Sequence, residues 1–195
     1  MEASTVLKLN GLAKRFGSIL ANDDVTIHLQ NGEVLALLGE NGAGKTTLMN
    51  MLFGHYLPDS GNIEIKSVNG DLVPLELGNP SAALAAGIGM VHQHFTLAEN
   101  ITAFENITLG ADSLFSLRRN QRKAEKKINN IMSNSGLEAP LDIPVGRLSV
   151  GERQRVEILK ALYRDAHILV LDEPTAVLTP QEADALFSNL RRSSE

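Results

Sequence analysis

The sequence predicts an α/β fold: a mixed sheet with flanking helices, an antiparallel β subdomain, and an inserted helical subdomain. Three features predict it. An apolar run, a glycine-rich loop and a helical pattern follow one another at residues 34–53. Apolar and polar residues alternate in short runs of the first third of the chain, which indicates antiparallel strands. Strand signals then disappear between about residues 95 and 144 and return afterwards.

The composition is that of one well-buried domain, with at most a small insertion. The chain has 195 residues, of which 43% are hydrophobic, and no cysteine. The lack of cysteine excludes disulfides and thiolate metal sites. The sequence shows neither a basic N-terminal region followed by an apolar core nor an apolar run of about 20 residues. We therefore expect a soluble protein of the cytoplasm.

The charge pattern gives no sign of nucleic-acid binding. The net charge is -5, so the chain as a whole is not attracted to nucleic acid. The one basic concentration, at residues 118–127, has its charges spread around a predicted helix. We interpret it as an ordinary solvated face rather than a phosphate-binding patch.

The most informative segment is the loop Gly39-Glu-Asn-Gly-Ala-Gly-Lys-Thr46, with the spacing G-x-x-x-x-G-K-[ST]. Its glycines let the chain curl so that backbone N–H groups converge on phosphate oxygens. Lys45 adds a positive charge, Thr46 offers a hydroxyl to Mg²⁺, and the following helix directs its positive end at the anion. The sequence thus predicts a P-loop NTPase core. The predicted nucleotide-binding residues of the loop are Gly39, Glu40, Asn41, Gly42, Ala43, Gly44, Lys45, Thr46 and Thr47.

The elements around this loop follow from local patterns. Residues 34–38 are predicted to form a buried strand, and residues 46–53 a helix ended by Gly54. Residues 25–29 alternate, and Asn31 and Gly32 are predicted to turn the chain back into the 34–38 strand. With residues 6–9 and 63–65 they predict an antiparallel sheet. A short helix at 81–86 and a strand at 88–92 follow.

Residues 95–144 are predicted to be the inserted helical subdomain, and residues 1–94 and 145–195 the nucleotide-binding core. In the returning α/β part, Ser149 and Glu152 form a capping box before a helix that reaches residue 162. A buried strand at 167–171 then ends in Asp172 and Glu173. In a chain with a P-loop, we expect Asp172 to bind Mg²⁺ and Glu173 to activate water.

At this point the segment Leu148-Ser-Val-Gly-Glu-Arg-Gln-Arg-Val156 resembles the signature loop Leu-Ser-Gly-Gly-Gln of the ATP-binding-cassette ATPases. Val150 and Glu152 depart from that pattern. The resemblance implies that Ser149 and Gly151 close over the γ-phosphate of a nucleotide held by a partner subunit.

The resemblance assigns two further positions. Phe16 takes the place of the aromatic residue that stacks on adenine, although a core phenylalanine is the alternative. Gln93 matches the loop glutamine that contacts Mg²⁺ or the attacking water. His92 and His94 flank it, but two histidines without acidic or cysteine neighbours predict no metal site.

Within the family, residues 90–95, 105–107 and 155–164 are most similar to ATPase subunits of importers for simple sugars and nucleosides. This implies Mg²⁺-dependent ATP hydrolysis on the inner face of the plasma membrane. The implied partners are a second cassette, membrane permeases and an extracytoplasmic solute-binding protein, without nucleic acid. The chain would be the first of two tandem cassettes, and the sequence does not identify the solute.

Two departures leave alternatives open. Thr179 stands where many relatives have aspartate, and the chain ends at Glu195, before the family's switch histidine. A nucleotide-binding fragment with little hydrolysis is therefore one alternative. The other is a soluble tandem-cassette ATPase acting on ribosomes or DNA, for which a basic surface or a long coiled-coil insertion is expected.

Overall fold

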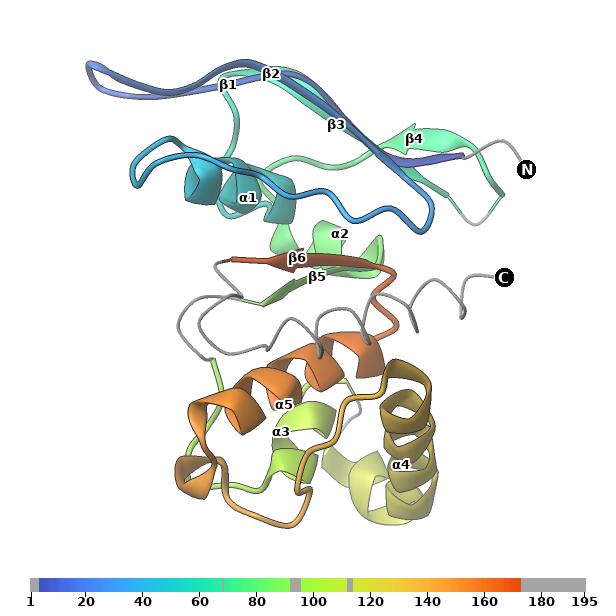
Figure 1. Cartoon of the computed structure of the whole chain (residues 1–195). Coiled ribbons are helices and arrows are strands. Elements are labelled where there is room, and N and C mark those ends of the chain that lie inside the picture. The colour runs from blue at the N-terminus through green and yellow to red at the C-terminus, as the bar shows by residue number, and fades with distance from the viewer. Residues whose placement is uncertain (1–3, 68, 92–95, 112–113, 173–195) are drawn as a thin grey trace. The chain divides into compact units, whose positions relative to one another are not determined.

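The computed structural model describes residues 4–67, 69–91, 96–111 and 114–172 (Figure 1). The chain divides into two compact units, at residues 1–88 and 89–195. Because this division does not test the predicted boundaries of the helical insertion at 95 and 144, those boundaries stay a prediction.

The first unit contains an antiparallel sheet, as predicted. Strand β1 (Thr5–Phe16) pairs with β2 (Ile19–Gln30) and with β3 (Ser60–Lys66), and β3 pairs with β4 (Leu72–Pro74). The order is β2-β1-β3-β4. Alternate side chains of β1 and β3 point into the core because a strand repeats every two residues; those buried are Leu7, Leu9, Ile63 and Ile65. Leu12 is also buried, beyond an irregularity in the pairing of β1.

Two helices complete this unit. Helix α1 (Lys45–Phe53) follows the P-loop, buries Leu48 and Met51, and ends at Gly54 in the left-handed conformation, as the sequence predicts. Helix α2 (Pro80–Ala85) begins at Asn79, whose side chain accepts hydrogen bonds from two backbone N–H groups of the first turn. Helix α1 contacts both α2 and β2.

The prediction of a strand at residues 34–38 is wrong. No residue of this run belongs to a strand, and most of its side chains are exposed, Leu38 by 93%. The turn at Asn31 and Gly32 is present, but the hairpin of this unit lies between β1 and β2 instead. A strand exists only where a neighbour completes its hydrogen bonds, and no described strand pairs with 34–38.

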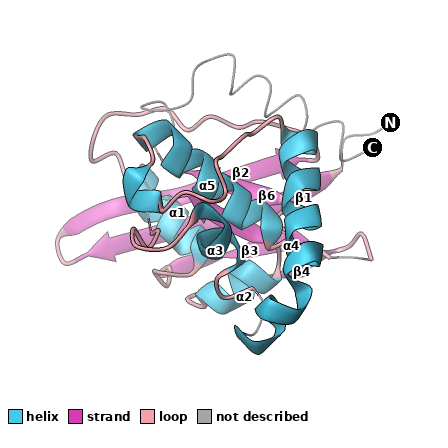
Figure 2. Cartoon of the chain, turned by 90° about the horizontal axis from the view of Figure 1, so that it is seen from below, coloured by secondary structure: helices cyan, strands magenta, loops and turns pink. Residues whose placement is uncertain are grey.

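The second unit combines a two-stranded sheet with helices. Strand β5 (Ile88–Val91) pairs with β6 (Ile168–Leu171), close to the predicted bounds. Its described helices are α3 (Ala103–Thr108), α4 (Leu114–Ser135) and α5 (Val150–Tyr163), with a 3₁₀ turn η1 (Val145–Arg147) before α5. The three α-helices contact one another (Figure 2). The helical content predicted for residues 95–144 is confirmed.

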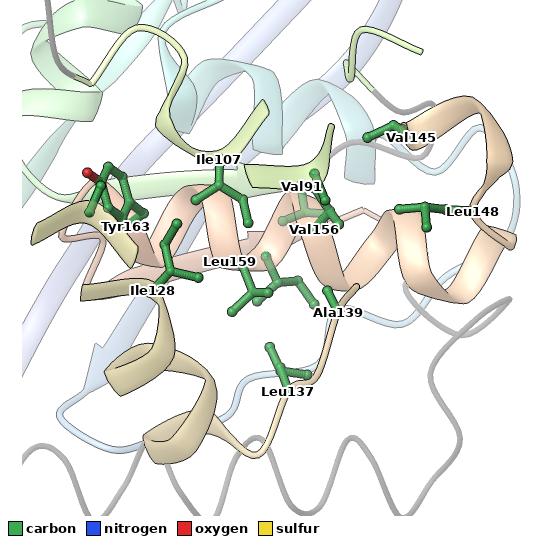
Figure 3. Packing of buried hydrophobic residues seen from close by; sticks show 13 residues of the cluster. Val91, Ile107, Ile128, Leu137, Ala139, Val145, Leu148, Val156, Leu159 and Tyr163 are labelled. Carbon is green, nitrogen blue, oxygen red and sulfur yellow. The ribbon is translucent and has the colours of Figure 1, made fainter. Parts of the chain in front are cut away.

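The core of the second unit forms around α5 (Figure 3). Val156, Ile158 and Leu159 are fully buried, and Ile107 of α3 and Ile128 of α4 pack into the same cluster. Lys127 of the basic stretch pairs with Asp165 at 2.8 Å and lies over the Tyr163 ring. Arg122, Lys123 and Lys126 are exposed, as expected for a solvated helix face.

Candidate functional site

The P-loop lies at the N-terminus of α1 in the first unit. Gly44 precedes the helix with φ of 85°, a left-handed conformation that favours glycine. A Cβ at Gly44 would also clash with the carbonyl oxygen of Ala21. The buried side chain of Asn22 donates from Nδ2 to the Gly44 carbonyl at 3.3 Å. Strand β2 therefore supports the loop directly, and Asn22 is a supporting residue that no sequence motif indicates.

Lys45 closes the P-loop onto itself. Its Nζ donates to the carbonyl oxygens of Gly39 at 2.7 Å and Glu40 at 2.8 Å. The Ala43 N–H donates to the Glu40 carbonyl. The ammonium group thus lies beside the start of the curl, at the positive end of a nine-residue helix. This arrangement concentrates positive charge for an anion.

Phe16 lies at the end of β1, beside the turn into β2. The residue is 43% exposed, and its ring meets that of Tyr56 at 5.4 Å between centroids. It is therefore not a core phenylalanine, and its predicted stacking on adenine stays a prediction.

The signature segment lies in the second unit at the N-terminus of α5. Ser149 and Glu152 form the predicted capping box: the Ser149 N–H and hydroxyl both donate to Glu152, and the Glu152 N–H donates back to Ser149 Oγ. Both hydrogen bonds from Ser149 lower the pKa of Glu152, and the one from the hydroxyl has the larger effect. Gly151 occupies the first turn of this helix.

Arg153 holds the chain before the signature. Its guanidinium donates to the carbonyl oxygens of Leu148 at 3.1 Å and Gly146 at 3.0 Å, and it pairs with Glu99 at 3.4 Å. No sequence motif indicates Arg153, since its partners are backbone carbonyls and a distant glutamate. Arg153 fixes the entry into α5 that presents Ser149.

Asp172 directly follows β6, as predicted. Its N–H donates to the Val91 carbonyl at 3.1 Å, so the ends of β5 and β6 meet. The Asp172 carboxylate is an oxygen donor of the kind that suits Mg²⁺, as is the hydroxyl of Thr46, an exposed residue of the first unit. Gln93 and Glu173, like His92, His94 and Thr179, lie outside the described residues.

The described residues contain neither a cluster of metal-binding side chains nor a membrane-spanning helix. No three His, Asp or Glu side chains gather there as a metal site. Magnesium in nucleotide sites takes only one or two protein ligands besides phosphates. Thr46 in the first unit and Asp172 in the second each carry an oxygen donor of the kind that it prefers. None of the described helices has the length and apolarity to cross a bilayer.

Comparison with protein families gives a match to the model described as ABC transporter over residues 22–176. The chain is 46% identical over 98% of its length to the nucleoside import ATP-binding protein NupA of Lactococcus lactis subsp. cremoris. It is 44% identical over 95% to the guanosine import ATP-binding protein NupO of Bacillus subtilis. Identity to the ribose import ATP-binding protein RbsA 1 of Burkholderia thailandensis is 43% over 96% of the chain. The chain spans only 37%, 36% and 36% of these relatives.

Solved structures agree in fold. An ATP-binding cassette of an ABC transporter in its ADP conformation matches with a TM-score of 0.75 and 27% identity, covering 97% of this chain and 77% of that one. A dimeric post-hydrolysis cassette bound to ADP and Pi matches with a TM-score of 0.70 and 26% identity, covering 97% and 83%. The predicted α/β fold with a P-loop NTPase core is confirmed.

Proposed function

Because the chain belongs to the ABC transporter family, we propose that it is the ATP-binding and ATP-hydrolysing part of an importer. The P-loop carries this proposal, with Lys45 held against Gly39 and Glu40 at the N-terminus of α1. ATP hydrolysis drives the uptake of a sugar or nucleoside. The names of relatives that import nucleosides, guanosine and ribose support this solute class over an ATPase that acts on ribosomes or DNA.

In this function the chain works mainly by placing charge. Loop N–H groups and Lys45 neutralise the β- and γ-phosphates, which is the main requirement of phosphoryl transfer. Thr46, Asp172 and Gln93 would hold Mg²⁺, which when bound would supply further positive charge at the phosphates. Glu173 accepts a proton from the attacking water, and the exposed ring of Phe16 stacks on the adenine.

The capping box suggests how a second cassette takes part. A capped helix N-terminus with Ser149 and Gly151 in its first positions is an anion site. Ser149 and Gly151 contact the γ-phosphate bound by the partner cassette, which agrees with a relative solved as a dimer with ADP and Pi. The helical segment 95–144 docks to a membrane permease. A solute-binding protein delivers the cargo, and the chain lies on the cytoplasmic face of the membrane.

Two substitutions test this assignment. Lys45→Ala should abolish binding of Mg-ATP by this chain, measured by calorimetry, because the loop loses its only side-chain cation. In the full-length importer subunit, Glu173→Gln should keep ATP affinity but lower turnover at least about a hundredfold, the usual contribution of a general base. Normal ATP affinity in Lys45→Ala would contradict the phosphate site, and near-normal turnover in Glu173→Gln would remove Glu173 from its role.

A further inference from the structure

A second aromatic side chain in the first unit has no role in the proposed function so far. Tyr56 lies just after α1 and is 39% exposed. Its ring meets that of Phe16 at 5.4 Å between centroids and at 73° between planes. A near-perpendicular contact is a favoured arrangement of two aromatic rings, so each ring restricts the orientation of the other.

Asp59, three residues after Tyr56, is hydrogen-bonded to β1, the strand that ends in Phe16. Its Oδ2 accepts from the Arg15 N–H at 2.7 Å, and its Oδ1 accepts from Lys14 Nζ at 3.0 Å. The Asp59 N–H donates to the Ala13 carbonyl. Three bonds therefore join Asp59 to consecutive residues of β1, immediately before Phe16. The position of Tyr56 next to Phe16 is fixed by this connection as well as by ring contact.

The aromatic pair lies next to the β1–β2 hairpin, which supports the P-loop through Asn22. Asn22, which donates to the Gly44 carbonyl, lies opposite Lys14 in the β1–β2 ladder. Phe16 is two residues beyond Lys14, about 7 Å at the rise of a strand. The end of the hairpin is therefore held at two places: Asn22, opposite Lys14, donates to the P-loop, and Phe16 contacts Tyr56.

We propose that Tyr56 is a positioning residue for the base of the bound nucleotide. Its ring fixes the orientation of the exposed Phe16 ring before the nucleotide binds, so that Phe16 is already ordered when it stacks on adenine. This inference rests on the proposed function of Phe16. A side chain ordered before binding loses less conformational entropy when the ligand arrives. Removal of Tyr56 therefore weakens binding of the base while binding of the phosphates is unchanged.

Calorimetry of the 195-residue chain with two ligands separates these contributions. Mg-ATP reports base and phosphate binding together, whereas Mg-tripolyphosphate reports the P-loop alone. Tyr56→Ala is expected to weaken Mg-ATP about two- to tenfold, the range for an aromatic pair, with unchanged affinity for tripolyphosphate. Tyr56→Phe, which keeps the ring, should behave as wild type. Leu57→Ala, an exposed neighbour in the same segment, is the matched control and should affect neither ligand.

A double substitution shows whether Tyr56 acts through Phe16. If it does, Tyr56→Ala combined with Phe16→Ala binds Mg-ATP as Phe16→Ala does. Additive losses, unchanged Mg-ATP affinity in Tyr56→Ala, or equal losses for both ligands would each overturn the inference. Tyr56→Leu, which keeps apolar bulk, must give the same separation as Tyr56→Ala. A wild-type chain that binds neither ligand would instead overturn the proposed function itself.

Discussion

Glu157, a carboxylate only 5% exposed in the middle of α5, accepts hydrogen bonds from both the backbone N–H and the hydroxyl of Thr96, at 2.5 and 2.9 Å. Lys160 of the same helix lies 3.8 Å from the other carboxylate oxygen. Burial lowers the pKa of Lys160, and the nearby Glu157 opposes that shift. The Glu157 carboxylate thus connects Thr96, three residues after Gln93, to α5, the helix that begins with the signature segment.

Glu157→Leu should lower the free energy of unfolding by about 1–3 kcal/mol, because the Thr96 N–H and the Lys160 ammonium lose their buried acceptor. Glu157→Gln should lose less, since an amide oxygen still accepts from Thr96. Urea unfolding at neutral pH measures both. The exposed Glu138 provides the control, and Glu138→Leu should change stability little. Equal losses in the two Glu157 variants would contradict the importance of the acceptor.

Two capping boxes in the second unit allow a role in stability to be separated from a role in catalysis. Thr102 with Glu105 caps α3 in the same way as Ser149 with Glu152 caps α5. Thr102→Ala and Ser149→Ala should each destabilise the chain by about 0.5–2 kcal/mol. Only Ser149→Ala should also reduce ATP turnover of the full-length importer. Equal effects of both variants on turnover would leave Ser149 with a structural role alone.

Gly44 and Gly42 have nearly equal φ values, 85° and 84°, but different surroundings. An added Cβ is free of contacts at Gly42 and clashes with the Ala21 carbonyl at Gly44. Gly42→Ala should cost about 1–2 kcal/mol of backbone strain, and Gly44→Ala clearly more. Urea unfolding gives the difference. Equal costs would mean that the contact between β2 and the P-loop is not tight in solution.

The capping glutamates predict loss of stability in acid. Hydrogen bonds from Thr102 hold the pKa of Glu105 below its usual value of 4.5, as those from Ser149 do for Glu152. The unfolded chain therefore binds more protons than the folded chain in this range. The stabilisation is complete above the usual value and is lost as the pH falls through the lower folded-state value.

Urea unfolding from neutral pH down to below the usual glutamate pKa checks this direction. Glu152→Gln should flatten the decline in stability at acid pH, because the residue no longer titrates, while Glu105→Gln should do the same for α3. A decline as steep as that of wild type in both variants would assign the acid sensitivity to other groups.

The elements predicted well are those whose causes are local. The glycine spacing of the P-loop, Gly54 at the end of α1 and the pair Ser149 and Glu152 each act within a few residues, so a sequence pattern contains the whole interaction. The alternating runs of β1 and β3 likewise reveal which side chains are buried. At residues 34–38 the apolar pattern predicted a strand that does not form, because a strand depends on neighbours that no local pattern specifies.

By itself, the sequence determined the phosphate-binding loop, the end of α1, the start of α5 and the family, because these depend on residue identities at short, fixed spacings. Only the tertiary structure revealed that Asn22 donates to Gly44, that Tyr56 contacts the Phe16 ring while Asp59 binds the neighbouring Arg15, and that Glu157 accepts from Thr96. Such contacts join residues 22 to 61 positions apart in the chain. Chain folding brings these partners together, and no local pattern specifies which residues meet.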